Sequence, residues 1–125
     1  MEQAERDLEH AKRDLRDGFY EWACFSAQQA AEKAAKAVLS RLGAEAFGHS
    51  VASLLEELPE PDRPGRDVYE MALELDKAYV PTRYPNVHPS GAPYKLYTAT
   101  EATRLIGHAE KILAFCKGLL SEVQP

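Results

Sequence analysis

The sequence predicts an all-α fold, an antiparallel up-and-down bundle of four to five helices. Five segments space their apolar residues with the period of a helix, no segment alternates apolar and polar residues as a strand does, and no Asn-Gly pair marks a hairpin. The chain has 125 residues, of which 45% are hydrophobic and 28% are charged. That length and composition are typical of one globular domain, so we expect a single domain over residues 1–125.

Glycines mark the ends of the first two expected helices. The apolar positions of the first helix are Ala4, Leu8, Ala11 and Leu15. The Asp17-Gly18 pair ends this helix, because glycine readily adopts the left-handed conformation at a helix C-terminus. A second, longer helix runs from about Phe19 to Leu42, and Gly43 ends it.

The second helix is expected to be the central one, because its many alanines let neighbouring helices approach closely. Its expected buried stripe consists of Phe19, Trp22, Ala23, Ala27, Ala30, Ala34, Val38 and Leu42. Its expected polar face consists of Gln28, Gln29, Glu32, Lys33 and Lys36. On that face Glu32 and Lys36 have the spacing of an ion pair one helical turn apart.

Three more helices are expected in the second half of the chain. A short third helix follows from Val51, Leu54, Leu55 and Leu58, and a fourth from Val68, Met71, Ala72, Leu75 and Tyr79. The prolines between residues 59 and 65 separate the two. The last helix runs from about Ala99 to Val123 and begins with Thr98-Ala99-Thr100-Glu101, the pattern of a capping box.

The segment between the fourth and the last helix breaks the helical pattern. Prolines recur at positions 81, 85, 89 and 93, which excludes helix throughout, and four of the six tyrosines lie between Tyr79 and Tyr97. Long ordered loops in small domains usually carry function. We therefore expect any chemistry of this protein to lie in this segment.

Charge is distributed unevenly along the chain. The net charge is −5, which argues against coating of nucleic acid by the whole surface. From Lys77 to Thr100 there is no acidic residue, and Lys77, Arg83 and Lys95 give this stretch a charge of +3, so the rest of the chain carries −8. An acidic body with one basic segment can bind an anion locally, although a solvated loop explains the same charges.

Three motifs occur in a specific order and spacing. The first is Gly18-Phe19-Tyr20 followed by residues 25–36 with Gln29-Ala30-Ala31-Glu32-Lys33; the second is His49 followed by Leu54-Leu55; the third is Tyr79 with Thr82-Arg83-Tyr84-Pro85. Together they resemble the HEPN domain family (higher eukaryotes and prokaryotes nucleotide-binding), and more narrowly its small stand-alone prokaryotic members with an Arg-Tyr-Pro turn. The resemblance covers nearly the whole chain and implies a helical bundle that is usually dimeric.

The resemblance also implies an activity. Many HEPN proteins are metal-independent ribonucleases that use an arginine and a histidine four to six residues apart, and Arg83 and His88 have four residues between them. Histidine titrates near neutrality and suits proton transfer, whereas a planar guanidinium can hold two phosphate oxygens. His88 is therefore the candidate proton-transfer group and Arg83 the candidate phosphate clamp. In the family two such pairs face each other across a dimer.

Further candidates surround this pair. Tyr84, Lys95 and Lys77 are the candidate nucleotide- or RNA-binding residues. Pro85 and Pro89 flank the histidine, and Tyr84 stands where the clearest nuclease members have a small polar residue, so binding without catalysis stays open. A structural role stays open too, with Arg83 as a cation at the C-terminus of the fourth helix.

Three functions from different classes follow. The first is a toxin-like, metal-independent ribonuclease of a toxin–antitoxin system, acting on single-stranded RNA or a nucleotide. The second is a non-catalytic partner or nucleotide-binding module of a small nucleotidyltransferase, which the resemblance also implies. The third is a plain helical dimerisation module.

Other sites are not expected. No two histidines have metal-ligand spacing, and no cofactor-binding motif is present, so we expect neither a metal nor a cofactor. His10 and His49 are weaker candidates, whereas His108 and Arg104 would share a helix face and could edge a binding surface. Cys24 and Cys116 fall among apolar helix positions and read as buried, reduced thiols. With no membrane span and no signal-peptide core, we expect a cytoplasmic protein.

Overall fold

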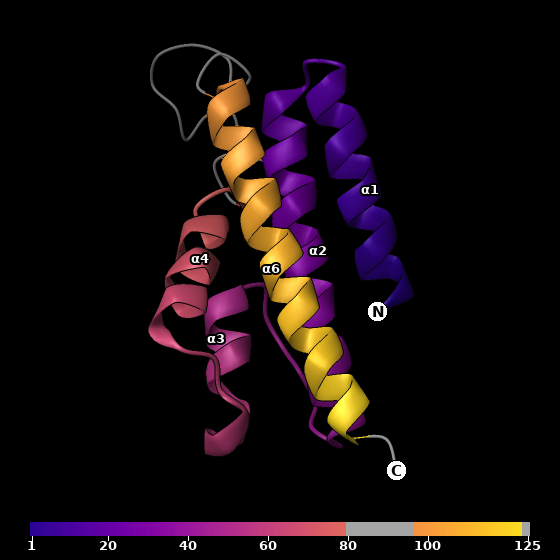
Figure 1. The fold of residues 1–125 in the computed structure, drawn as a ribbon, viewed down its shortest axis with the longest axis vertical. Helices are drawn as coiled ribbons and strands as arrows, with labels where there is room; N and C mark the ends of the chain where they lie inside the picture. Colours follow the sequence, from indigo (N-terminus) through magenta and orange to yellow (C-terminus); the bar gives the residue numbers. More distant parts are fainter. Residues whose placement is uncertain (80–96, 124–125) are drawn as a thin grey trace.

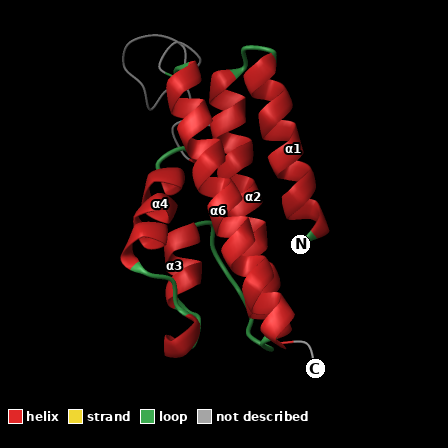
Figure 2. Cartoon of the chain, viewed as in Figure 1, coloured by secondary structure: helices red, strands yellow, loops and turns green. Residues whose placement is uncertain are grey.

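The computed structural model describes residues 1–79 and 97–123. All of its regular elements are helical, and there is no strand among these residues (Figure 2). The elements are α1 (Glu2–Arg16), α2 (Tyr20–Arg41), α3 (Val51–Glu56), the 3-10 helix η1 (Glu60–Asp62), α4 (Arg66–Asp76) and α6 (Ala99–Val123). The all-α bundle is confirmed, and each of the five expected helices is present within a few residues of its expected ends.

The three long helices α1, α2 and α6 pack side by side, and the shorter α3 and α4 lie along one side of them (Figure 1). Helix α2 packs against all four other α-helices, so the expectation that it is central is confirmed. Helix α1 runs antiparallel to α6, as the ion pairs Lys12–Glu110 (3.0 Å) and Glu5–Lys117 (3.4 Å) show. Within the described residues no helix is long and apolar enough to cross a bilayer.

The connection from α2 to α3 interrupts the up-and-down alternation. Residues 42–50 run back along α2, and the side-chain amide of Gln28, in the middle of α2, donates to the backbone oxygen of His49 at 2.7 Å (Figure 1). Helix α3 therefore starts beside the middle of α2. Helices α2, α3 and α6 then run in one direction, and α1 and α4 run in the other (Figure 1).

The core is built around α2, which is buried on nearly every side in its middle. Its buried apolar residues are Ala23, Cys24, Ala27, Ala30, Ala31, Ala34, Ala35, Val38 and Leu39. The expected stripe was wrong at the two ends of the helix: Phe19, Trp22 and Leu42 are 53%, 48% and 38% exposed. The physical reason is that α2 is longer than the region in which its neighbours surround it.

The expected polar face of α2 was wrong at two positions as well. Gln28 is fully buried and Glu32 is 4% exposed, because α3, α4 and residues 42–50 cover this face of the helix. The lysines behave as expected. Lys36 pairs with Glu32 at 3.0 Å, and Lys33 pairs with Asp7 of α1 at 2.6 Å.

Local signals fix the helix ends. Gly18 and Gly43 follow α1 and α2 with φ of +84° and +83°, which is the left-handed conformation expected of a helix-ending glycine. The Thr98 hydroxyl accepts a hydrogen bond from the backbone N–H of Glu101 at 3.0 Å and so caps α6. Ser50 caps α3 in the same way, through the N–H of Ser53 at 3.1 Å.

Candidate functional site

Most of the predicted site lies outside the described residues. Arg83, His88, Tyr84 and Lys95 belong to residues 80–96, which the structure does not describe, and the Arg-Tyr-Pro turn lies there too. Lys77 is described, and it is exposed at the C-terminal end of α4. Tyr79 and Tyr97 flank the undescribed segment, and the residues around them form the described part of the candidate site.

Lys77 lines a surface hollow of about 360 Å³ between the end of α4 and the first turns of α6. The other lining residues are Glu74, Ala78, Tyr97, Glu101, Arg104 and Leu105. Two cations and two carboxylates therefore share the hollow. The structure brings Lys77 close to Arg104, the cation that the sequence analysis placed at the edge of a binding surface.

Ion pairs across this hollow join α4 to α6. The Arg104 Nε donates to Glu74 at 2.6 Å, and the His108 ring nitrogen lies 3.2 Å from the other oxygen of that carboxylate. Burial raises the pKa of Glu74, but the hydrogen bonds and charges of Arg104 and His108 outweigh it and bring the net pKa below its ordinary value. Arg104 and His108 thus share a helix face, as expected, and both of them face Glu74.

Tyr97 anchors the other end of the undescribed segment. It packs against the core, and burial, followed by the negative charge that Cys24 would carry and that of Glu101, raises the pKa of its hydroxyl to about 12. The phenol therefore stays protonated at physiological pH. Tyr97 can donate a hydrogen bond there, but it cannot act as a base.

A second cluster forms at Tyr79, around His49, a histidine that the sequence analysis names as a weaker candidate. The imidazole of His49 stacks on the Tyr79 ring, with centroids 4.7 Å apart and ring planes 14° apart. The Nδ1 of His49 lies 3.3 Å from each carboxylate oxygen of Glu32. Residues from α2, from the connection before α3 and from the segment just after α4 thus meet at one point.

Every one of these residues belongs to a motif quoted for the family resemblance. Glu32 lies in the Gln-Ala-Ala-Glu-Lys run, His49 stands before the short third helix, and Tyr79 precedes the Arg-Tyr-Pro turn. The three residues are far apart in sequence and touch only in the fold. The sequence did hold one signal for the burial of Glu32: this glutamate lies among alanines on the helix that is expected to be central.

Asp76 stabilises the backbone next to this cluster. Its carboxylate accepts hydrogen bonds from the backbone N–H groups of Val51 (2.7 Å) and Ala52 (3.1 Å) and from the hydroxyl of Ser50 (2.8 Å). It also lies 3.4 Å from the side-chain nitrogen of Gln28. A carboxylate at the end of α4 therefore fixes the start of α3, and with it the backbone that carries His49.

A row of aromatic rings leads from this cluster to the surface. Tyr79 lies 5.9 Å from the ring of Phe25, and Phe25 lies 6.2 Å from Trp22 in an edge-to-face arrangement. Trp22 is 48% exposed and its neighbour Phe19 is 53% exposed. The N-terminal end of α2 thus presents apolar surface next to the aromatic row that begins at Tyr79.

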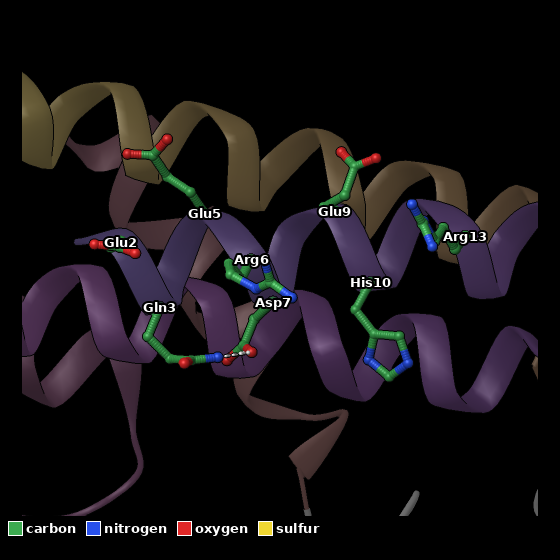
Figure 3. A pocket seen from close by; sticks show the side chains of 8 residues that line it. All are labelled: Glu2, Gln3, Glu5, Arg6, Asp7, Glu9, His10 and Arg13. Atoms are coloured by element: carbon green, nitrogen blue, oxygen red, sulfur yellow. Dashed lines mark hydrogen bonds between the residues drawn. The ribbon is translucent and has the colours of Figure 1, made fainter.

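Another hollow, of about 550 Å³, lies on α1, away from both clusters. Its lining residues are Glu2, Gln3, Glu5, Arg6, Asp7, Glu9, His10 and Arg13. All of them come from one helix, and among the side chains drawn only Gln3 and Asp7 are joined by a hydrogen bond (Figure 3). The space lies between long side chains on one helix surface. Among the described residues no group of His, Cys, Asp and Glu could hold a metal ion.

Comparison with known families matches most of the chain. The family model described as the HEPN domain matches residues 1–119. A protein of Methanocaldococcus jannaschii named "Putative toxin MJ1304" is 29% identical over 140 residues, which cover 98% of this chain and 86% of that protein.

Solved structures match over nearly the whole chain as well. A crystal structure from Thermus thermophilus has a TM-score of 0.92 and 47% identity, covering 94% of this chain and 93% of the other. An archaeal HEPN homologue has a TM-score of 0.79 and 46% identity, with 94% and 91% covered. An HEPN domain protein from Thermotoga maritima has a TM-score of 0.79 and 51% identity, with 97% and 96% covered.

Proposed function

Because this chain belongs to the HEPN domain family, we propose that it is a toxin-type HEPN protein that cleaves single-stranded RNA without a metal ion. The name of the archaeal relative supports the toxin class. The observation that carries the proposal is the acid-free stretch from Lys77 to Thr100, which holds Arg83 and His88 at the spacing used by the family's nucleases. The described start of this stretch, Lys77, lies in one hollow with Arg104.

The chemistry of the proposed site needs no cofactor. The 2′-hydroxyl of RNA attacks the adjacent phosphorus, and His88 transfers a proton while Arg83 meets the charge that builds on the phosphate oxygens. Tyr84 would offer a surface on which a base can stack, and Lys77 and Lys95 would neutralise neighbouring phosphates. The acidic remainder of the chain would restrict RNA to this one region.

Cleavage in the presence of EDTA tests the proposal. Purified chain is incubated with labelled single-stranded RNA, and wild type is compared with Arg83→Ala and His88→Ala. We expect a loss of about 10²-fold or more for each variant, the range for removal of positioned acid–base or charge-stabilising groups. Arg66→Ala and His10→Ala are matched controls, because these side chains are 90% and 66% exposed on α4 and α1. Cleavage that survives in both site variants would refute the assignment.

The proposed active form is a homodimer. In the family the composite site takes an arginine–histidine pair from each of two chains, and the exposed Phe19 and Trp22 offer apolar surface near that region. Light scattering of purified chain at micromolar concentration tests this expectation. A strict monomer that still cleaves RNA would show that one chain makes the whole site.

A non-catalytic role beside a small nucleotidyltransferase is the second candidate. The charge of −8 outside the basic stretch favours it, since such a surface suits a basic protein partner better than extended RNA. Here the purified chain would fail to cleave RNA. It would form a stable complex with a purified nucleotidyltransferase from the same source, measured by calorimetry.

We also propose that the protein works in the cytoplasm. Cys24 and Cys116 are both buried and free, which fits a reducing compartment.

A further inference from the structure

His49 combines exposure with rigid placement. Its side chain is 57% exposed, yet three groups fix it: the Glu32 carboxylate at Nδ1, the Tyr79 ring against one face, and the Gln28 amide on its backbone oxygen. An exposed side chain usually samples several rotamers. The surroundings of His49 remove that freedom.

The contact with Glu32 determines which nitrogen of His49 carries the proton. A carboxylate paired with the Lys36 ammonium at 3.0 Å accepts hydrogen bonds and does not donate them, so Nδ1 of His49 must donate. In the neutral ring the other nitrogen, Nε2, is then the acceptor. Within the described residues no protein group is bonded to Nε2.

The carboxylate of Glu32 is buried, which is unusual for a residue whose only role would be to hold residues 42–50 against α2. It is 4% exposed, and Lys36 and Gln29 hold it by contacts of 3.0 Å and 3.3 Å. Burying a carboxylate is costly unless its partners compensate. The hydrogen bond from Gln28 already fastens the backbone of His49 to α2, so the carboxylate is not needed for that purpose.

We propose that His49 is the general base of the RNA cleavage described above, an assignment that rests on the proposed function. Nε2 takes the proton of the 2′-hydroxyl as its oxygen forms a bond to phosphorus. The bond from phosphorus to the 5′-oxygen breaks, and that oxygen leaves with the proton whose transfer the proposed function assigns to His88. Glu32 stabilises the imidazolium that forms, because its carboxylate faces the Nδ1 proton.

The position of the pair fits this role. Tyr79, on which His49 stacks, lies in sequence between Lys77 and Arg83, two of the residues to which the proposed function assigns phosphate binding. Among the described residues, the titratable groups near the imidazole are Glu32 and Lys36 of α2 and Tyr79 just after α4. Asp76 lies 3.4 Å from the side chain of Gln28, which bonds the backbone of His49. Substrate would approach from the open side at Nε2.

The test compares His49→Ala with His10→Ala, a matched control because His10 is also exposed and also lies near a carboxylate, that of Asp14, at 3.6 Å. Single-turnover cleavage of single-stranded RNA is measured in EDTA between pH 5 and 9. We expect His49→Ala to lose about 10²-fold or more and to lose the rise of the rate with pH. Added imidazole should restore part of the rate in His49→Ala only. Melting temperatures measured alongside show whether each variant is folded.

A folded His49→Ala variant that cleaves at the wild-type rate with the wild-type pH profile would overturn the inference, while losses in Arg83→Ala and His88→Ala would keep the proposed function. If wild type does not cleave at all, the proposed function fails. Titration with 2′-fluoro RNA, which lacks the attacking 2′-hydroxyl, then tests whether His49 contacts RNA at all. The NMR signals of the His49 ring are followed during the titration. A shift of the His49 signals that is absent from His10 supports an RNA contact, and unshifted signals overturn it.

Discussion

Replacement of Asp76 by alanine should destabilise the fold more than the same replacement of any other Asp or Glu that is partly exposed to solvent. Asp76 accepts from the N–H groups of Val51 and Ala52 and from the Ser50 hydroxyl, and Val51 and Ala52 are buried. Loss of a helix cap costs about 0.5–2 kcal/mol, and a hydrogen bond to a charged group contributes about 1.5–3 kcal/mol. Because Asp76 is only half-buried, we take about 1 kcal/mol for each of the three bonds, or about 3 kcal/mol in all.

Urea denaturation followed by circular dichroism measures this loss, and thermal melting should show a shift of about 10 °C for a domain of this size. Asp76→Asn keeps one acceptor oxygen and the shape of the side chain, so it should lose about half as much. Glu57→Ala is the control, since Glu57 is exposed and ends the same helix, α3; we expect a change within about 0.5 kcal/mol. A loss below about 1 kcal/mol in Asp76→Ala would refute the view that this carboxylate holds the start of α3.

Two further predictions concern thiols and acid stability. Burial raises the pKa of Cys24 and of Cys116 to about 12, so neither thiol should react with a thiol reagent at pH 8 until urea unfolds the chain; fast reaction of the native protein would contradict their burial. The pKa of Glu74 lies below its ordinary 4.5 in the folded state, so its contacts with Arg104 and His108 stabilise the fold above that pH and lose their effect as pH falls through the folded value. The difference in unfolding free energy between wild type and Glu74→Gln should therefore be present at pH 7, small as for partly exposed ion pairs, and absent near pH 2.

The helices could be predicted from sequence because their signals are local. Gly18 and Gly43 end α1 and α2, and Thr98 begins α6, where the sequence placed these boundaries. The face of α2 that each residue occupies could not be predicted as well. An alanine-rich helix has little contrast between its sides, so the exposure of Trp22 and the burial of Glu32 depend on where the other helices end.

The candidate site was predicted in part only. The sequence singled out the basic stretch and its arginine–histidine pair, which lie outside the described residues apart from Lys77. It did not join His49 to Glu32 or to Tyr79, because those contacts span 17 and 30 positions and form only when residues 42–50 run back along α2. No local pattern carries that information.

The length of the connection between α2 and α3 sets the alignment of His49 with the middle of α2. Removal of one residue from positions 45–48 would draw the chain along by roughly 3.5 Å, about one residue of extended backbone, and would separate an imidazole and a carboxylate that now lie 3.3 Å apart. The α-helices that the structure describes would keep their sequences and caps. Two proteins with the same bundle could therefore differ in this pair through a single deletion in a surface connection, which would be invisible to a comparison of helices alone.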